Sequence, residues 1–149
     1  MMKYEQAKTY LESVRQCRLQ INRLELCIIR VRTEMENPLG NIAQGERVQT
    51  SAVNSFEAKM VRYLDLLGKH ETAYAKAKEA YEEKLYQAES MIMLLPDGRV
   101  KEFLLAYYID GMSELDFGVA MGYETTGSVY NLKRRAIRTF ATNFTMVIE

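Results

Sequence analysis

Apolar side chains recur with a seven-residue period over residues 3 to 36, and this pattern predicts a long amphipathic helix. The two seam positions of the heptad frame hold only apolar or amphipathic residues: Ala7, Val14, Ile21, Ile28 and Met35 at one, and Tyr10, Cys17, Leu24 and Val31 at the other. A frame sustained this far without glycine or proline indicates a helix packed along its length against a partner helix. The pattern alone does not name that partner.

A second periodic stretch covers residues 53 to 95. Its seam positions hold Met60, Leu67, Tyr74, Tyr81, Ala88 and Leu95, and Phe56, Tyr63, His70, Ala77, Lys84 and Met91. Only His70 and Lys84 depart from the apolar pattern. The simplest partner is the first helix, folded back antiparallel as a coiled-coil hairpin. Pairing between two chains and a dimeric four-helix bundle fit the same pattern.

Two breaks divide the chain. Asn37-Pro38 ends the first helix, because proline disfavours helical geometry in the residue before it, and a loop is predicted over residues 37 to 52. Pro96-Asp97-Gly98 is a turn sequence that ends the second helix. We therefore expect two domains, a helical hairpin over 1–95 and a smaller unit over 96–149.

The smaller unit contains signals for three helices. Residues 100 to 109 form a support helix, and Ser113 can cap a short helix that Gly122 ends, because glycine takes the left-handed backbone a helix stop often needs. The last helix can start under a Thr125 or Thr126 cap and run to about residue 143. The predicted fold class is all-α: a long antiparallel hairpin followed by a tri-helical helix-turn-helix.

The last helix has two faces of different character. Val129, Leu132, Ala136, Phe140 and Phe144 share one side; Gly127, Asn131, Arg134 and Arg138 lie opposite, flanked by Tyr130 and Arg135. Residues 126–145 carry four bases and no acid, whereas residues 97–124 carry two bases and six acids. Such a face suits a helix in the DNA major groove, where Arg pairs with guanine and Asn with adenine. A solvated basic face of a helical bundle is the alternative.

These side chains divide by expected role. We predict that Lys133, Arg135 and Arg138 contact phosphates and set the register on double-stranded DNA. Asn131, Arg134 and Thr126 are expected to read base edges.

Composition narrows the class of protein. The 149 residues carry a formal net charge of zero, so only the local distribution of charge speaks for nucleic acid. No apolar run approaches the roughly 20 residues of a membrane span, and no signal-peptide pattern is present, so we expect a cytoplasmic protein with no membrane partner. Cys17 and Cys27 lie roughly 15 Å apart on one predicted helix and are expected to be free thiols.

No catalytic constellation is present in the sequence. Asp116-Phe117-Gly118 matches a kinase fragment, but it lies inside a predicted helix without a glycine-rich loop or partner lysine. Phosphate-binding glycine motifs, nucleophile motifs and metal-ligand spacings are also missing. We therefore expect no enzyme activity, no cofactor and no metal.

Five short runs stand out in and before the smaller unit: Leu95-Pro96-Asp97, Tyr108-Ile109-Asp110-Gly111-Met112-Ser113, Met121-Gly122-Tyr123, Ser128-Val129-Tyr130 and Arg134-Arg135-Ala136. Together they resemble the phage transcriptional regulators of the ArpU and RinA type. The C-terminal part of that family is similar to region 4 of bacterial sigma factors. By motif match, the resemblance implies the DNA-facing positions Thr126, Ser128, Tyr130, Asn131, Arg134 and Arg135. Gly118 stands where the family usually has alanine, a loss of about 1 kcal/mol in helix propensity.

The resemblance implies a phage or prophage regulator of late gene expression that acts by recruitment or by contact with RNA polymerase. The hairpin is expected to supply either a homodimer contact or the polymerase contact. Two other classes fit the same pattern: a small-terminase-like packaging component, which usually places its DNA-binding unit first, and a helical interaction module that does not bind DNA.

Overall fold

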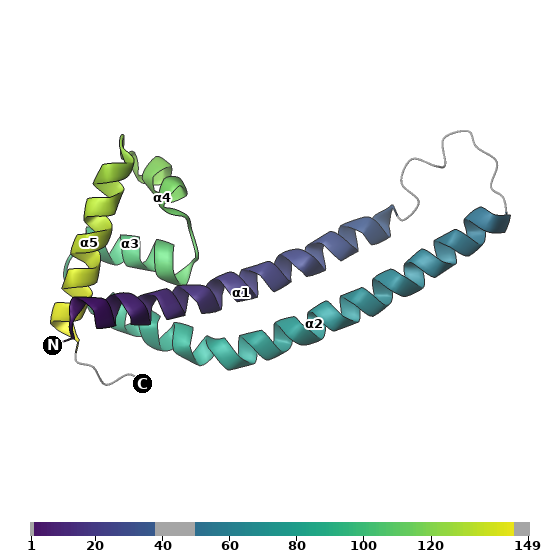
Figure 1. Ribbon diagram of the computed structural model, residues 1–149, viewed down its shortest axis with the longest axis horizontal. Helices are drawn as coiled ribbons and strands as arrows, with labels where there is room; N and C mark the ends of the chain where they lie inside the picture. The colour runs from purple at the N-terminus through teal and green to yellow at the C-terminus, as the bar shows by residue number, and fades with distance from the viewer. Residues whose placement is uncertain (1, 38–49, 145–149) are drawn as a thin grey trace. The chain divides into compact units, whose positions relative to one another are not determined.

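The computed structural model describes residues 2–37 and 50–144, and every regular element in these ranges is helical. The elements are α1 (Tyr4–Glu36), α2 (Thr50–Met93), α3 (Gly98–Leu104), the π-helical turn η1 (Leu105–Ile109), α4 (Glu114–Met121) and α5 (Thr126–Asn143) (Figure 1). The all-α fold class is confirmed. Most of the predicted loop at 37–52 lies outside the described residues, and residues 50–52 belong to α2.

The chain divides into two compact units. The terminal unit comprises Met1–Gln20 and Glu79–Glu149, and the central unit comprises Ile21–Lys78. This division differs from the predicted boundary between residues 95 and 96, because the first turns of α1 and the last turns of α2 fall in the same unit as α3, α4 and α5. Tyr10 of α1 stacks on Phe140 of α5, and its hydroxyl lies 4.0 Å from the Met91 sulfur of α2. A heptad pattern shows which face of a helix is buried but not which element buries it.

Aromatic rings form the core of the terminal unit. Phe103 of α3 meets Phe117 of α4 edge to face with ring centroids 5.1 Å apart, and Tyr10 of α1 stacks on Phe140 of α5 at 6.0 Å. Tyr108, at the end of η1, is also fully buried. Aromatic rings bury large apolar areas, so these contacts tie four elements into one core.

The π-helical turn explains how so many large side chains face this core. Phe103 and Tyr108 are five positions apart, and so are Leu104 and Ile109, yet all four side chains are buried. In a regular α-helix residues five apart diverge by about 140°. The Asp110 amide donates to the Leu105 carbonyl, which is the i→i+5 spacing of a π-helix, and the wider turn brings both pairs to one side.

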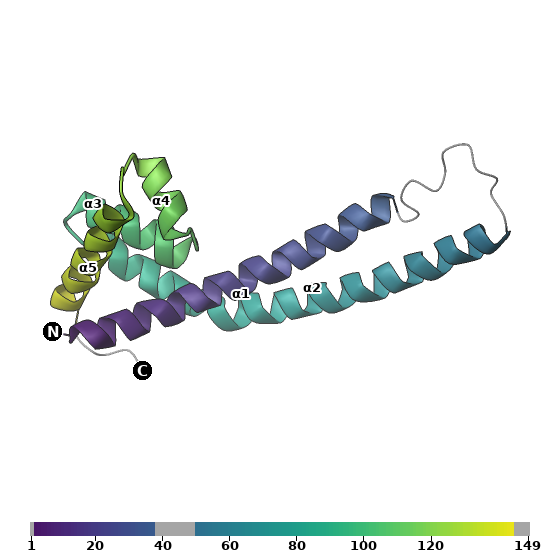
Figure 2. The same ribbon diagram turned by 45° about the horizontal axis from the view of Figure 1, so that its top comes forward.

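The central unit contains the remaining parts of α1 and α2, which lie side by side in both ribbon views (Figure 1, Figure 2). Arg32 pairs with Glu71 at 3.1 Å across the two helices. Ile21, Ile28 and Val31 of α1 are buried, but no described α2 side chain between residues 55 and 78 is. The central unit therefore buries few side chains.

Candidate nucleic-acid interface

The N-terminus of α5 is fixed by a side-chain cap. Thr125 has extended backbone geometry, and its Oγ1 accepts a hydrogen bond from the Ser128 amide at 3.2 Å. The hydroxyl groups of Thr125 and Ser128 lie 2.9 Å apart. Thr125, and not Thr126, is therefore the cap, and the Ser128 hydroxyl is engaged by it.

The inward face of α5 sets the rotation of the helix. The residues buried on it are Val129, Leu132, Ala136, Ile137, Phe140 and Ala141. Four of the five positions predicted for this face are among them, and the fifth, Phe144, is half-buried beyond the end of the helix. The opposite face is thereby held toward solvent.

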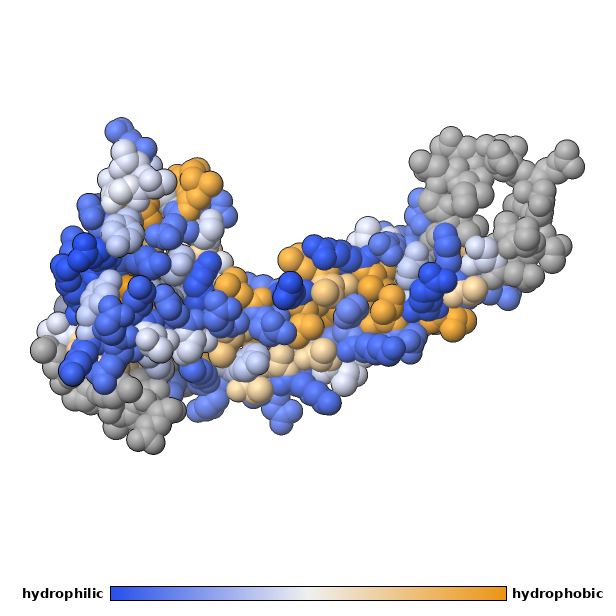
Figure 3. All heavy atoms as spheres, viewed as in Figure 1, coloured by the Kyte–Doolittle hydropathy of each residue, from blue (hydrophilic) through white to orange (hydrophobic). Residues whose placement is uncertain are grey.

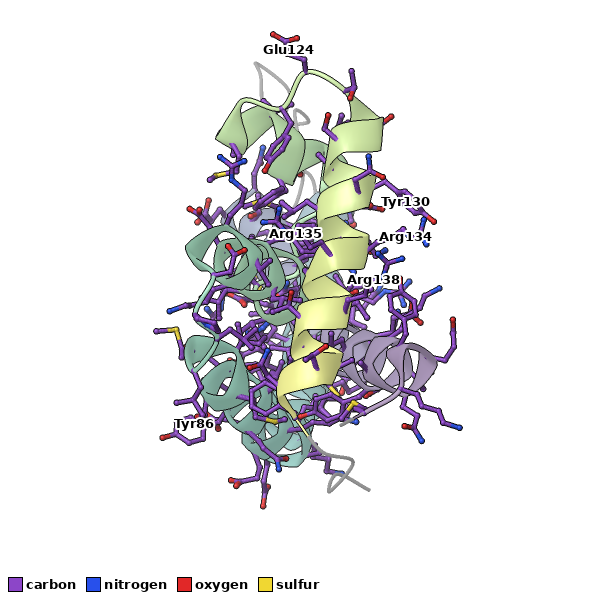
Figure 4. All side chains as sticks on the ribbon, turned by 90° about the vertical axis from the view of Figure 1, so that its left-hand side faces the viewer. Tyr86, Glu124, Tyr130, Arg134, Arg135 and Arg138 are labelled. Carbon is purple, nitrogen blue, oxygen red and sulfur yellow. The ribbon has the colours of Figure 1, made fainter. Side chains whose placement is uncertain are left out.

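The outward face of α5 carries four of the predicted DNA-facing residues. Asn131, Arg134 and Arg138 are exposed, and Tyr130 is 55% exposed. Tyr130, Arg134 and Arg138 project from the same side of α5 (Figure 4). The Arg134 guanidinium lies 6.0 Å from the centre of the Tyr130 ring. Within the described ranges, neither Arg134 nor Arg138 forms an ion pair.

Two predicted phosphate contacts have partners inside the protein. The Lys133 side chain is 16% exposed, and its ammonium lies 3.4 Å from the Tyr107 hydroxyl and 3.9 Å from a Glu114 carboxylate oxygen. Arg135 projects from the other side of α5 and donates to Asp97 at 3.1 Å. Sequence periodicity gives the side of α5 from which each residue projects. It could not show that Asp97, Tyr107 and Glu114 lie on those sides as partners.

Helix α4 is capped at both ends. Ser113 Oγ accepts from the Asp116 amide at 3.1 Å, and Gly122 ends the helix with a left-handed backbone at φ 76°. Both features were predicted. Gly118 is buried, and a β-carbon there would lie 3.1 Å from Val129 Cγ2. The missing side chain therefore lets α4 approach α5 closely, which helix propensity alone did not indicate.

The outer surface of α4 is apolar and acidic. Leu115 is 66% exposed and Val119 74% exposed, while Glu114 and Asp116 lie in the first turn. Apolar surface is visible over α4 in the space-filling view (Figure 3). Thr126, a predicted base-reading residue, lines a groove together with Glu114, Leu115 and Val119. The predicted DNA-facing residues thus form two groups. Arg134 and Arg138 lie on the outward face of α5, whereas Thr126 lies beside the apolar surface of α4.

Two arginines of α1 bind backbone carbonyls at the end of η1 and in the connection to α4. The sequence interpretation missed both. Arg15 donates to the carbonyl oxygens of Tyr107 and Met112, the latter at 2.9 Å, and Arg18 donates to the Ile109 carbonyl at 2.7 Å. The carbonyls at the end of a helix lack partners within that helix, so these contacts satisfy them. The local signal was weak: two bases, three residues apart, beside an apolar seam.

Four groups in the terminal unit have shifted pKa values, and one of them is the Tyr10 phenol, whose pKa is raised by burial. A hydrogen bond from the Val100 amide, helped by the Arg99 amide and the charge of Arg135, outweighs desolvation and holds the pKa of Asp97 below its ordinary value. Burial raises the pKa of the Tyr108 phenol and of the Cys17 thiol. Cys17 and Cys27 are both free.

The described residues contain no cluster of three or more His, Cys, Asp or Glu side chains able to hold a metal ion. Among the helices described, none combines the length and apolar character that crossing a membrane requires. Comparison with protein-family models, curated proteins and solved structures finds no match for this chain.

Proposed function

We propose that the chain is a phage or prophage-encoded, sequence-specific DNA-binding regulator of transcription, in which α4 and α5 act as a helix-turn-helix. The observation that carries the proposal is the outward face of α5. Asn131, Arg134 and Arg138 are exposed on a helix whose opposite face is anchored in the core. Arg and Asn at exposed positions of one helix face match the hydrogen-bonding edges of guanine and adenine in the major groove.

The contacts inside the protein refine the assignment of roles. Arg134 and Asn131 read base edges, and Arg138 contacts phosphate. Lys133 and Arg135 contribute to phosphate binding only if they leave Glu114 and Asp97, so their contribution is expected to be smaller than that of Arg138. The mechanism is recruitment, through contact with RNA polymerase, and involves no chemical step.

The first test is binding of the purified protein to fragments of its source genome at two salt concentrations, followed by sequencing of the bound DNA. A site-specific regulator enriches one intergenic site, with an affinity that falls steeply as salt rises. Arg134→Ala should weaken that binding by about 1–3 kcal/mol and relax the sequence preference. Arg62→Ala, an exposed arginine of α2 in the central unit, is the matched control and should change little.

Two results would contradict this assignment. Equal losses on specific and random DNA would make Arg134 a phosphate contact and not a base contact. No enrichment at either salt concentration would show that the protein does not act by binding specific DNA.

We further propose that the central unit forms a coiled-coil hairpin through which two copies associate. Both helices expose large apolar side chains there: Leu26, Ile29, Phe56, Val61 and Leu64. A two-helix unit with no buried α2 side chain between residues 55 and 78 leaves much apolar surface in water, and a second helical pair would cover it. A dimer also presents two copies of α5, as palindromic operators require.

A second function, a helical interaction module that does not bind DNA, is favoured by one observation. The outer surface of α4 combines exposed Leu115 and Val119 with the acids Glu114 and Asp116. Acids repel phosphate, so this surface suits protein better than DNA. Partner binding that is insensitive to mutation of Arg134 and Arg138, together with no DNA binding, would support this function.

A further inference from the structure

A groove of about 720 Å³ lies between α4, the following turn and the first turns of α5. Its apolar lining comes from Leu115, Gly118, Val119, Tyr123, Val129 and Tyr130. We refer to this feature as the α4–α5 groove. It lies entirely within the terminal unit, away from the central unit. Arg134 and Arg138 do not line it, although two other predicted DNA-facing residues, Thr126 and Tyr130, do.

The fold does not require the two most exposed side chains at this groove. Leu115 and Val119 are four residues apart, so they share one side of α4, while Phe117 and Gly118 supply its buried side. Tyr130 faces solvent across from them, at 55% exposure. Exposed apolar side chains that line a concave surface mark an interaction site.

Charge around the groove selects the kind of partner. Glu114 and Glu124 line it, and the exposed Asp116 stands beside it on α4, whereas no lysine or arginine lines it. Glu124 lies at the turn between the two helices (Figure 4). The ammonium of Lys133 lies 3.9 Å from Glu114 and offsets part of that charge. Arg99 and Arg134 stand outside the lining, each 6.0 Å from the ring of a lining tyrosine, so Glu114 and Glu124 remain the charged groups that face the groove itself. The groove therefore favours a cationic partner and repels DNA phosphate.

A second copy of this surface is a poor occupant. A two-fold contact places the same patch on both sides of the interface, so Glu114, Asp116 and Glu124 would meet their own copies. Like charges brought together oppose such an association.

We infer that the α4–α5 groove binds an amphipathic helix of another protein, with large apolar residues spaced three or four apart and lysine or arginine on their flanks. The apolar residues of that helix enter between Leu115, Val119 and Tyr130, and its cations pair with Glu114 and Glu124. Laying a helix into an apolar groove is a common mode of peptide recognition. The inference does not rest on Arg134 and Arg138, the arginines proposed to bind DNA, because neither lines the groove.

The test uses the full chain and a fluorescent amphipathic peptide of about 18 residues, five turns of helix, built from Leu, Ala and Lys. A second peptide has Glu in place of every Lys. Fluorescence anisotropy should show saturable binding of the lysine peptide and at least about tenfold weaker binding of the glutamate peptide. Glu124→Gln should weaken only the lysine peptide.

Matched variants locate the binding site. Leu115→Gln and Val119→Gln should each weaken the lysine peptide about tenfold. Leu94→Gln changes a side chain that is 77% exposed and lies outside the groove, so it should leave the affinity unchanged. All three residues are at the surface, so the fold should persist, which circular dichroism checks.

Three results would overturn the inference. Equal binding of the two peptides would mean that the surface is merely apolar. An equal loss in Leu94→Gln would place the peptide elsewhere. A loss of DNA affinity in Leu115→Gln, with peptide binding unchanged, would make the groove part of the DNA surface.

Discussion

Tyr108 carries a buried hydroxyl with no hydrogen-bond partner, and among the described residues it is the only buried side-chain polar atom in this state. Its ring is fully buried against Phe103 and Tyr107. Burial raises the pKa of the phenol above its ordinary value, so the group stays neutral. The ring stabilises the core, whereas the hydroxyl opposes folding, because it loses its hydrogen bonds to water and gains none.

Tyr108→Phe should therefore raise the free energy of unfolding by about 1 kcal/mol, since it removes an unsatisfied polar group and keeps the ring. Urea denaturation measures the change. Tyr107→Phe is the matched control, because the Tyr107 hydroxyl lies 3.4 Å from the Lys133 ammonium, and it should not stabilise the protein. A lower stability of Tyr108→Phe would show that the hydroxyl has a bound water or another partner.

Asp97 makes the stability depend on pH. Its carboxylate caps α3 by accepting from the Val100 and Arg99 amides, and its pKa is lower in the folded than in the unfolded chain. Such a group stabilises the fold above its unfolded pKa, and this stabilisation is lost as pH falls through the folded pKa. Asp97→Asn keeps a capping oxygen but loses the titration.

Below about pH 4, wild type should consequently lose more stability per pH unit than Asp97→Asn, while the two should respond alike between about pH 6 and 8. Urea midpoints across this range give the comparison. Parallel curves at low pH would show that Asp97 is not the group responsible.

At the scale of single elements, the end of the α3–η1 segment depends on a helix far away in the sequence. Arg15 donates to two carbonyls there, and its guanidinium lies 3.9 Å from the centre of the Tyr107 ring. Both hydrogen bonds come from one nitrogen, Nη1, while the planar group lies over the ring. An ammonium group has enough donors for two carbonyls, but it lacks the flat face that stacks on a ring.

Arg15→Ala should lower the free energy of unfolding by about 2 kcal/mol, as expected for losing hydrogen bonds from a charged donor. Arg15→Lys should recover less than half of this loss. The control is Arg23→Ala, which removes an exposed arginine from the same helix inside the central unit and should cost little. Full rescue by lysine would mean that a charged donor, without the planar group on the Tyr107 ring, holds the segment.

Features formed by residues close together in the sequence could be predicted, whereas contacts between distant residues could not. The predicted helices at 3–36 and 53–95 end within about three residues of α1 and α2, because proline and glycine act locally. The caps at Ser113 and Gly122 and the buried face of α5 follow from local chemistry in the same way. Arg15, Lys133 and Arg135 were beyond such reasoning, because their partners lie 19 or more positions away.

At the scale of the whole molecule, α1 and α2 each belong to both compact units. A fragment starting at residue 96 would lack Arg15, Arg18 and the Tyr10 ring that stacks on Phe140. The predicted DNA-binding unit is therefore best studied in the intact chain.

The proposed pairing of central units makes the melting temperature depend on protein concentration, because association stabilises only the folded chain. The melting temperature should rise with concentration in wild type. In a variant that combines Leu26→Gln and Leu64→Gln, both about half exposed, this rise should disappear and sedimentation should show a monomer. A wild-type monomer at every concentration would assign the exposed apolar residues to a different partner.

The π-helical turn at Leu105–Ile109 also bears on how any related sequence should be aligned with this one. A π-turn corresponds to one extra residue in an otherwise regular helix, and here it sets the five-residue spacing between Phe103 and Tyr108. A homologue with an unbroken α-helix at this place would carry its inward aromatic residues three or four apart, and a single-residue gap would restore the match. Without that gap, every position from Tyr108 to the outward face of α5 would be aligned one residue out of register.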